Sequence, residues 1–324
     1  MVGGKLSEPF DITTGVLQGD VLAPFLFIIV MDYVMSRSEQ SFGFVYQPRT
    51  GTASRGRLEQ RLNDQDYADD EALFESSVAR ANEQLTTHCL EAWGVGLEIN
   101  VDKPEYMVIN PRPSERDAQL LLNGKPIKRV ENFKYLGANL KSSAFDLACR
   151  RGQAWSAFWA LERIWRDKSI RIDLKINIYK TAVFSVLSYG CETWALTKSM
   201  EASIDGFGTN CLRVILGIKK IDHVPNEEIH KRSGMKPLTC FIRERQLGYL
   251  GHILRRDDNE PCKVFALYEP THGRRAQGRP KLSYSRYMAG LITDAPENCT
   301  RESITSLAQD RKKWGRIVAG AGAY

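Results

Sequence analysis

The sequence predicts an α+β protein in which a part built on a small antiparallel sheet with helices precedes a mostly helical part. Two observations support this fold class. In residues 64–74, turn-forming residues separate two short apolar or aromatic patches, which is typical of a tight β-hairpin. From Phe145 onward, apolar residues such as Ala154, Phe158 and Leu161 recur at three- and four-residue spacing, which indicates amphipathic helices.

The net charge of +6 is distributed unevenly along the 324 residues. Of the 45 basic and 39 acidic residues, 14 and 20 lie in residues 1–139 (net −6), which leaves 31 and 19 (net +12) for the rest. This asymmetry favours a phosphate-backbone partner for the second half of the chain. Ordinary lysines and arginines on solvated helix surfaces are the alternative explanation.

No stretch reaches the length of a membrane span, because the longest apolar run, from Val21 to Val34, is interrupted by Pro24 and Asp32. The chain also lacks the basic start and small-residue cleavage site of a secretory signal. Its seven cysteines are widely spaced and indicate reduced thiols. We therefore expect an intracellular protein, in the nucleus or cytoplasm, without a membrane partner.

Residues 10–19 predict a short strand followed by a glycine-bearing loop. Gly15 and Gly19 allow the backbone to approach a bulky ligand closely. Pro24 then lies in the first turn of a helix that runs to about Met35. This helix is rich in Leu, Phe, Ile and Val, so we expect it to lie in the core.

Residues 44–63 predict a loop or hairpin that leads to the stretch Tyr67-Ala68-Asp69-Asp70. Neighbouring residues of one strand point apart, but at a turn both carboxylates can approach one site. Phosphoryl transfer to a 3′-hydroxyl needs two hard cations about 3.5–4 Å apart, held by carboxylate oxygens. The hairpin tip is thus a candidate for part of such a cage, with a solvated acidic turn as the alternative.

Ser76 or Ser77 is expected to cap a helix that continues to about Trp93, followed by a strand-like segment around Lys103. Residues 127–140 predict a second hairpin. In the helical part we expect helices at residues 154–165, 176–186, 204–216, 237–254 and 303–318, the last of which is a single terminal helix.

A basic tract at residues 273–281 contains no apolar side chain larger than alanine, so it cannot pack a core. Its cations suit contacts to nucleic-acid phosphates; the candidates are Arg274, Arg275, Arg279 and Lys281. We expect three parts, divided as 1–140, 141–255 and 256–324.

Four stretches, at residues 13–27, 67–70, 96–103 and 132–137, carry a resemblance to a known family. In this order and with these gaps, they resemble motifs in the C-terminal part of non-LTR (LINE-type) retrotransposon reverse transcriptases. The resemblance covers nearly the whole chain. It implies a partial polymerase palm, then a helical thumb or connection, then a basic C-terminal extension.

The resemblance implies roles for individual residues. Asp69 and Asp70 would be catalytic metal ligands for Mg²⁺ or Mn²⁺, with two ions in the complete enzyme, and Lys103 would act near the pyrophosphate leaving group. The partners would be an RNA template, a DNA primer and deoxynucleotides, and the second hairpin would grip the primer. The implied contacts to nucleotide and template come from Gly15, Gln18, Gly19 and Tyr67.

The sequence departs from the family pattern at two positions. Pro104 replaces a residue that is most often threonine, and proline can change the aim of Lys103. Glu71 replaces an apolar β-branched residue, and an extra carboxylate beside the metal cage would perturb ion binding.

A third catalytic aspartate and the fingers are expected upstream of the Gln18 loop and are not found. We therefore expect a fragment of an RNA-directed DNA polymerase that is inactive alone. Whether the chain is itself an enzyme is left open. A non-catalytic nucleic-acid-binding remnant of a retroelement is the second hypothesis. A third is a product that folds poorly because a palm without its first strands exposes a sheet edge.

Overall fold

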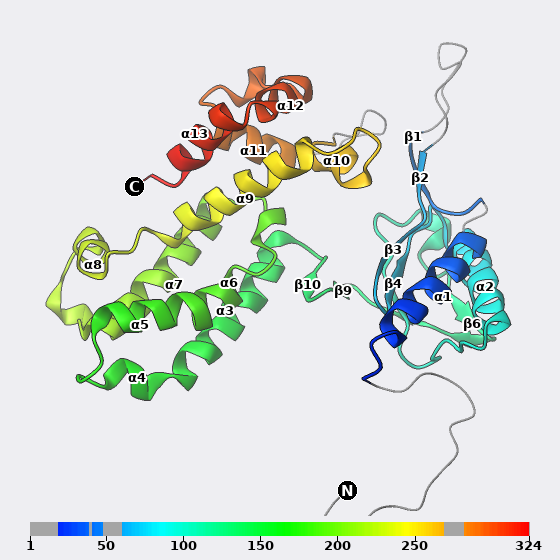
Figure 1. Cartoon of the computed structure of the whole chain (residues 1–324), viewed down its shortest axis with the longest axis horizontal. Coiled ribbons are helices and arrows are strands. Elements are labelled where there is room, and N and C mark those ends of the chain that lie inside the picture. Colours follow the sequence, from blue (N-terminus) through cyan, green and yellow to red (C-terminus); the bar gives the residue numbers. More distant parts are fainter. Residues whose placement is uncertain (1–18, 39–40, 48–59, 269–281, 324) are drawn as a thin grey trace, which may run out of the picture. The chain divides into compact units, whose positions relative to one another are not determined.

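The computed structural model describes residues 19–38, 41–47, 60–268 and 282–323 (Figure 1). The chain forms two compact units, Met1–Phe133 and Lys134–Tyr324. The predicted α+β class is confirmed, since helices predominate and are accompanied by small, mostly antiparallel strand pairs. The predicted three-part division stays a prediction.

The first unit contains two long helices and four strand pairs among its described residues. The helices are α1 (Ala23–Ser38) and α2 (Val78–Gly94), with a short 3₁₀ turn, η2 (Pro113–Glu115). The strands are β1 (Phe44–Gln47), β2 (Gln60–Leu62), β3 (Asp64–Tyr67), β4 (Asp70–Leu73), β5 (Glu105–Tyr106), β6 (Leu121–Leu122), β7 (Lys125–Pro126) and β8 (Lys128–Arg129). β1–β2, β3–β4 and β6–β7 are antiparallel, whereas β5–β8 is parallel.

Helix α2 organises this unit because it has two buried faces. Ser77 caps its N-terminus as predicted, and its hydroxyl accepts a hydrogen bond from the Arg80 amide. One face, which begins with Val78 and Leu85, packs on a small cluster with Leu122 of β6. The polar residues Gln84 and His88 are also buried, and their contacts are described below.

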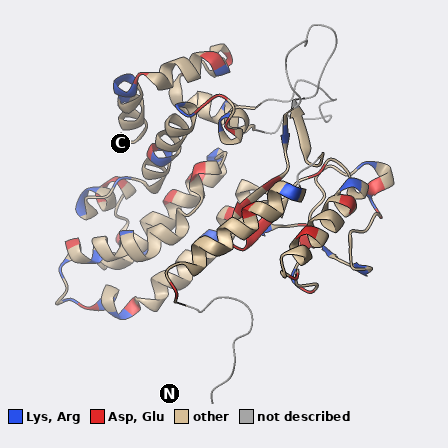
Figure 2. Cartoon of the chain, turned by 45° about the vertical axis from the view of Figure 1, so that its right-hand side comes forward, with Lys and Arg blue, Asp and Glu red and all other residues tan. Residues whose placement is uncertain are grey.

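Helix α1 begins near Pro24 as predicted, but the expectation that it lies in the core is wrong. Only Val34, Met35 and Ser38 are buried. Several of its large apolar side chains are at least half exposed, among them Phe25 at 64% and Ile29 at 64%. Figure 2 accordingly shows α1 as an almost uncharged helix. The described residues therefore leave much of this helix uncovered.

The second predicted hairpin is shorter than expected. Residues 127–133 are not part of it, because β8 pairs in parallel with β5 instead. The hairpin consists of β9 (Lys134–Tyr135) and β10 (Ala138–Asn139), which open the second unit. Both loop residues, Leu136 and Gly137, have positive φ, the geometry of a two-residue hairpin turn.

The remainder of the second unit is helical and shares one hydrophobic cluster that runs from Leu147 to Trp314. Its helices are α3 (Ser143–Ala160), α4 (Glu162–Arg166), α5 (Ile172–Ile178), α6 (Ser185–Leu187), α7 (Lys198–Leu216), α8 (Asn226–Ser233), α9 (Leu238–Leu254), α10 (Pro261–Ala266), α11 (Tyr284–Ile292), α12 (Arg301–Gln309) and α13 (Arg311–Ala321). A π-helical segment, η3 (Tyr179–Phe184), joins α5 to α6, and single turns form η4 (Cys191–Thr193), η5 (Lys220–Asp222) and η6 (Pro296–Asn298).

The single terminal helix predicted at 303–318 is two helices, α12 and α13. Asp310 separates them because its carboxylate accepts hydrogen bonds from the amides of Lys312 and Lys313, both at 3.0 Å, and so caps α13. The cysteines of the chain are free thiols, as predicted. Among the described residues, no helix is long and apolar enough to cross a membrane.

Candidate functional site

The stretch Tyr67-Ala68-Asp69-Asp70 forms the tip of the β3–β4 hairpin, as predicted. Four cross-strand pairs define its register, from Asp64 opposite Leu73 to Tyr67 opposite Asp70. Ala68 and Asp69 form a two-residue loop, in which Ala68 adopts a φ of 59°. This left-handed conformation is uncommon for alanine and favours glycine. The loop thus holds its backbone in a strained conformation beside both aspartates.

The hairpin tip presents its two adjacent carboxylates to solvent. Asp69 and Asp70 are both exposed, and the Tyr67 side chain beside them is 66% exposed. Because Asp70 lies opposite Tyr67 in the register, these two side chains occupy the same face of the hairpin. The structure thus brings together three of the predicted site residues, Tyr67, Asp69 and Asp70.

The carboxylate of Glu71 lies against helix α2. Strand alternation turns Glu71 to the face opposite Asp70, where one of its oxygens lies 2.8 Å from Nε2 of the buried His88. The Nδ1 atom of the same imidazole lies 3.4 Å from the Ser38 hydroxyl of α1. The predicted effect of Glu71 on ion binding stays a prediction; in the structure, its carboxylate joins the hairpin to α2.

The other end of the hairpin is also held by α2. The carbonyl oxygen of Asn63, just before β3, accepts hydrogen bonds from the Phe74 amide at 2.8 Å and from the Gln84 side chain at 3.2 Å. Gln84 is almost fully buried. Since Gln84 and His88 lie one helical turn apart, a single face of α2 supports the hairpin at two points. The tip is therefore carried by a rigid base.

The donor atoms at the tip fit a hard divalent cation in kind but fall short in number. Carboxylate oxygens are the ligands that Mg²⁺ prefers, and Asp69 and Asp70 supply them from adjacent positions. Among the described residues, no group of three or more His, Cys, Asp or Glu side chains could hold a metal ion. The tip can thus provide only part of a metal-binding cage.

The remaining predicted site residues lie elsewhere or outside the described part of the chain. Gly19 precedes α1 and has a φ of 96°, which agrees with the role of a glycine in a loop. Lys103 is exposed in a bend two residues before β5, rather than in a strand. Six predicted residues lie outside the described residues: Gly15, Gln18, Arg274, Arg275, Arg279 and Lys281.

The β9–β10 hairpin is anchored to the helical unit by a buried carboxylate. Asp146 of α3 accepts hydrogen bonds from the amide of Asn139 at 3.0 Å, from its side chain at 2.8 Å and from the indole of Trp194 at 2.9 Å. On the loop side, the hydroxyl of Tyr189 donates to the Leu136 carbonyl at 2.7 Å. The hairpin is therefore a fixed feature of the second unit.

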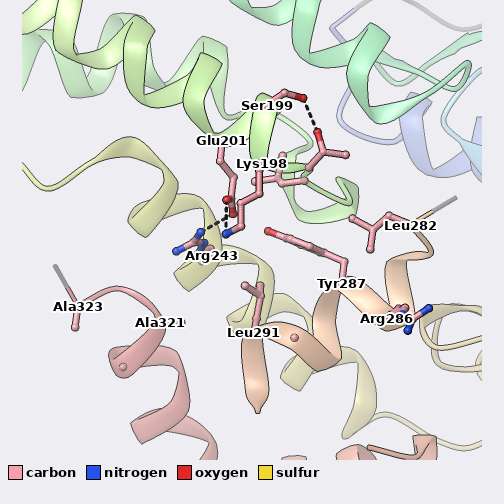
Figure 3. Close-up of a pocket in the computed structure, with 14 residues that line it drawn as sticks. Lys198, Ser199, Glu201, Arg243, Leu282, Arg286, Tyr287, Leu291, Ala321 and Ala323 are labelled. Carbon is pink, nitrogen blue, oxygen red and sulfur yellow. Dashed lines mark hydrogen bonds and ion pairs between the residues drawn. The ribbon is translucent and has the colours of Figure 1, made fainter. Parts of the chain in front are cut away.

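An open cavity of about 1130 Å³ lies in the second unit, and we refer to it as the α7–α11 cavity (Figure 3). Its walls come from the start of α7, from α9 and α11, and from the C-terminal end of α13. Its polar residues are Thr197, Lys198, Ser199, Glu201, Arg243, Arg286 and Tyr287. Sequence reasoning missed this site because its charged residues lie on three separate helices, and no local pattern brings them together.

Comparison with known proteins places the hairpin in a family context. Residues 1–140 match the family described as "Reverse transcriptase (RNA-dependent DNA polymerase)". A transposon-derived protein of Caenorhabditis elegans is 25% identical over 270 residues, which cover 78% of this chain and 93% of that protein.

Two retrovirus-related Pol polyproteins of R2 retrotransposable elements are also similar. The one from Popillia japonica is 26% identical over 72% of this chain, but the match covers only 37% of that polyprotein. The one from Drosophila melanogaster is 30% identical over 43% of this chain and 13% of its own length. The chain therefore spans a minor part of both polyproteins.

Proposed function

Because the chain is a relative of non-LTR retrotransposon reverse transcriptases, we propose that its β3–β4 hairpin is the metal-binding hairpin of an RNA-directed DNA polymerase. In this proposal, Asp69 and Asp70 hold divalent cations, Mg²⁺ or Mn²⁺. The observation that carries it is the pair of exposed, adjacent carboxylates on a hairpin whose base is fixed to α2. A solvated acidic turn would need no such support.

The reaction joins the 3′-hydroxyl of a primer to the α-phosphate of a deoxynucleotide and releases pyrophosphate. When bound, two divalent cations would supply Lewis-acid stabilisation of the attacking and leaving oxygens. The contribution of Asp69 and Asp70 is to hold these ions at one place and to keep that place negatively charged. The fixed hairpin base limits the motion of both carboxylates, which such catalysis requires.

We propose the remaining roles from the family resemblance. Lys103 is exposed, and we propose that its ammonium group neutralises the charge that develops on the pyrophosphate. Gly15, Gln18, Gly19 and Tyr67 are proposed to contact the nucleotide and the template.

The proposal includes a further carboxylate from outside the described residues, in the same or another polypeptide. Two aspartates alone lack the additional ligand that bridges two cations. We therefore propose that residues 19–38, 41–47, 60–268 and 282–323 do not constitute an active polymerase without that contribution. Nucleic-acid binding is therefore measured together with synthesis in the primer-extension experiment.

A second candidate function is nucleic-acid binding without chemistry. The charge of the sequence favours it, because residues 140–324 carry 31 basic and 19 acidic residues, a net charge of +12. In this reading, the partner is RNA or DNA and the basic residues Arg274, Arg275, Arg279 and Lys281 contact its backbone.

Primer extension on an RNA template distinguishes the two functions. The wild-type chain is compared with Asp69→Asn, Asp70→Asn and the control Asp117→Asn, which removes an exposed carboxylate from another loop of the first unit. Binding of the primer–template is measured in parallel by fluorescence anisotropy. Synthesis that is lost in the first two variants, with binding retained in all, supports the polymerase. Binding without synthesis in the wild-type chain, even when a relative's upstream polymerase segment is added, supports the binder.

A further inference from the structure

The α7–α11 cavity is lined by three cations and one carboxylate, and two of the cations contact the carboxylate. Lys198 begins α7, Arg243 belongs to α9 and Arg286 to α11, while Glu201 lies one turn into α7. Arg243 forms an ion pair with one oxygen of Glu201, and the Lys198 ammonium lies 3.2 Å from the other. The four charges sum to +2, so the cavity has an excess of positive charge.

The cations are more accessible to solvent than the carboxylate. The Lys198 side chain is 94% exposed and that of Arg243 is 26% exposed, whereas that of Glu201 is only 12% exposed. Arg286 is exposed as well. A charged group that enters from solvent therefore meets ammonium and guanidinium groups before it meets Glu201. This arrangement favours an anion over a cation.

Glu201 stabilises the positive charge of Arg243. Burial alone would lower the pKa of its guanidinium, but the hydrogen bond and the charge of Glu201 outweigh burial and raise that pKa. Its Nε atom is buried and has no hydrogen-bond partner among the described residues. Arg243 thus stays cationic while keeping hydrogen-bonding capacity that its surroundings do not use.

The cavity wall is held in place by buried contacts. The Tyr287 hydroxyl donates to the Gln246 side chain at 2.8 Å, and the same amide group donates to the carbonyls of Cys191 at 2.7 Å and Trp194 at 2.9 Å. Tyr287 is also part of the hydrophobic cluster of this unit. A ligand would therefore find a preformed site.

The distribution of side chains suits a chain of phosphates. In Figure 3, Lys198, Glu201 and Arg243 lie together on one side of Tyr287, and Arg286 lies on the other. Leu282 and Leu291 flank the Tyr287 ring and offer apolar surface between the two sets of cations. Cations on both sides of an apolar surface suit the phosphates of a nucleic-acid strand, with its less polar groups against the apolar side chains.

We propose that the α7–α11 cavity binds the phosphodiester backbone of a nucleic-acid strand. Leu282 of its wall directly follows Lys281, the last residue of the basic tract predicted to contact nucleic acid. The inference extends the proposed nucleic-acid partner to a defined site in the second unit. It does not involve Asp69 or Asp70, so it can fail while the proposed polymerase site holds.

The test is the affinity of the full chain for a fluorescein-labelled single-stranded oligonucleotide, measured by anisotropy at several salt concentrations. The variant is Lys198→Gln/Arg286→Gln, in which both altered side chains are exposed. The matched control is Lys231→Gln, an exposed lysine of α8 outside the cavity.

We expect the double variant to bind roughly tenfold more weakly at physiological salt and to lose about 1.4 from the slope of log K against log salt, about 0.7 per lost phosphate contact. The control Lys231→Gln should bind as the wild-type chain does. Equal binding by the double variant, or equal weakening by Lys231→Gln, would overturn the proposal. Inorganic phosphate is titrated as a second ligand. If the double variant lost affinity for phosphate but not for the oligonucleotide, the proposal would also be overturned.

Discussion

The imidazole of His88 and the carboxylate of Glu71 lie 2.8 Å apart and join helix α2 to the strand that carries Asp70. His88 is almost fully buried, and the second oxygen of Glu71 is buried without a hydrogen-bond partner among the described residues. Glu71, one residue pair from the hairpin tip, therefore depends on His88 as its polar partner.

Removal of one partner should destabilise the first unit more than removal of both. We expect His88→Leu to lower the free energy of unfolding by about 2–3 kcal/mol, because it leaves the Glu71 carboxylate largely buried and without its partner. The double variant Glu71→Leu/His88→Leu should lose less than His88→Leu alone, and therefore less than the sum of the single variants. Urea unfolding followed by tryptophan fluorescence measures both values, with the exposed Glu98→Gln as control. Additive losses would show that the two residues do not interact.

The hairpin should be more stable with glycine than with alanine at position 68. The φ of 59° at Ala68 costs alanine about 1–2 kcal/mol, whereas glycine loses about 0.5–1 kcal/mol more backbone entropy on folding. Ala68→Gly should therefore stabilise the first unit by roughly 0.5–1 kcal/mol. Ala72→Gly, in β4 of the same hairpin, is the control and should be destabilising. A loss of stability in Ala68→Gly would mean that the loop does not hold this conformation.

Asp146 should be essential for the position of the β9–β10 hairpin. Asp146→Ala removes the acceptor of three hydrogen bonds, two from Asn139 and one from Trp194. We expect a loss of about 2–4 kcal/mol in the free energy of unfolding, with faster amide hydrogen exchange at residues 134–139. Asp173→Ala removes an exposed aspartate of α5 and should change neither quantity. Unchanged exchange in Asp146→Ala would contradict the anchoring role.

The buried thiols should make the second unit less stable in alkaline solution. Burial, with a further contribution from the charge of Glu192, raises the pKa of Cys191 to about 12. An unfolded thiol ionises near pH 8.5, so above that pH the unfolded chain releases a proton that the folded chain keeps. Stability should therefore fall by up to about 1.4 kcal/mol per pH unit for this thiol between these two pKa values.

The measurement is urea unfolding of the wild-type chain and of Cys191→Ala at pH 8 and pH 10. The decrease between these two pH values should be smaller in the variant. Equal decreases would show that Cys191 ionises as readily in the folded chain as in the unfolded one.

Local patterns predicted much of the structure. A helix cap at Ser76 or Ser77 and a hairpin tip at Asp69 and Asp70 were predicted because turns and helix ends depend on a few neighbouring residues. The break at Asp310 was missed because the apolar periodicity continues across it while its carboxylate caps a new helix. Burial of α1 was predicted wrongly, since apolar composition shows what a helix prefers and not which surfaces are present to cover it.

Contacts between distant segments were beyond the reach of the sequence. Glu71 was recognised as a departure from the family pattern, but nothing in the sequence predicted its contact with His88 on the next helix. The α7–α11 cavity depends on Lys198, Arg243 and Arg286 meeting through the packing of three helices. Such sites follow from tertiary packing, which short-range periodicity does not encode.

Binding of Mn²⁺ to the full chain tests the proposed metal-binding hairpin most directly. Electron paramagnetic resonance measures free Mn²⁺ during titration of the wild-type chain, of Asp69→Asn/Asp70→Asn and of the control Asp117→Asn. We predict that the wild-type chain and the control bind Mn²⁺ with the same affinity and that the double variant loses this binding. Identical titration curves for all three chains would contradict a metal-binding role for the hairpin.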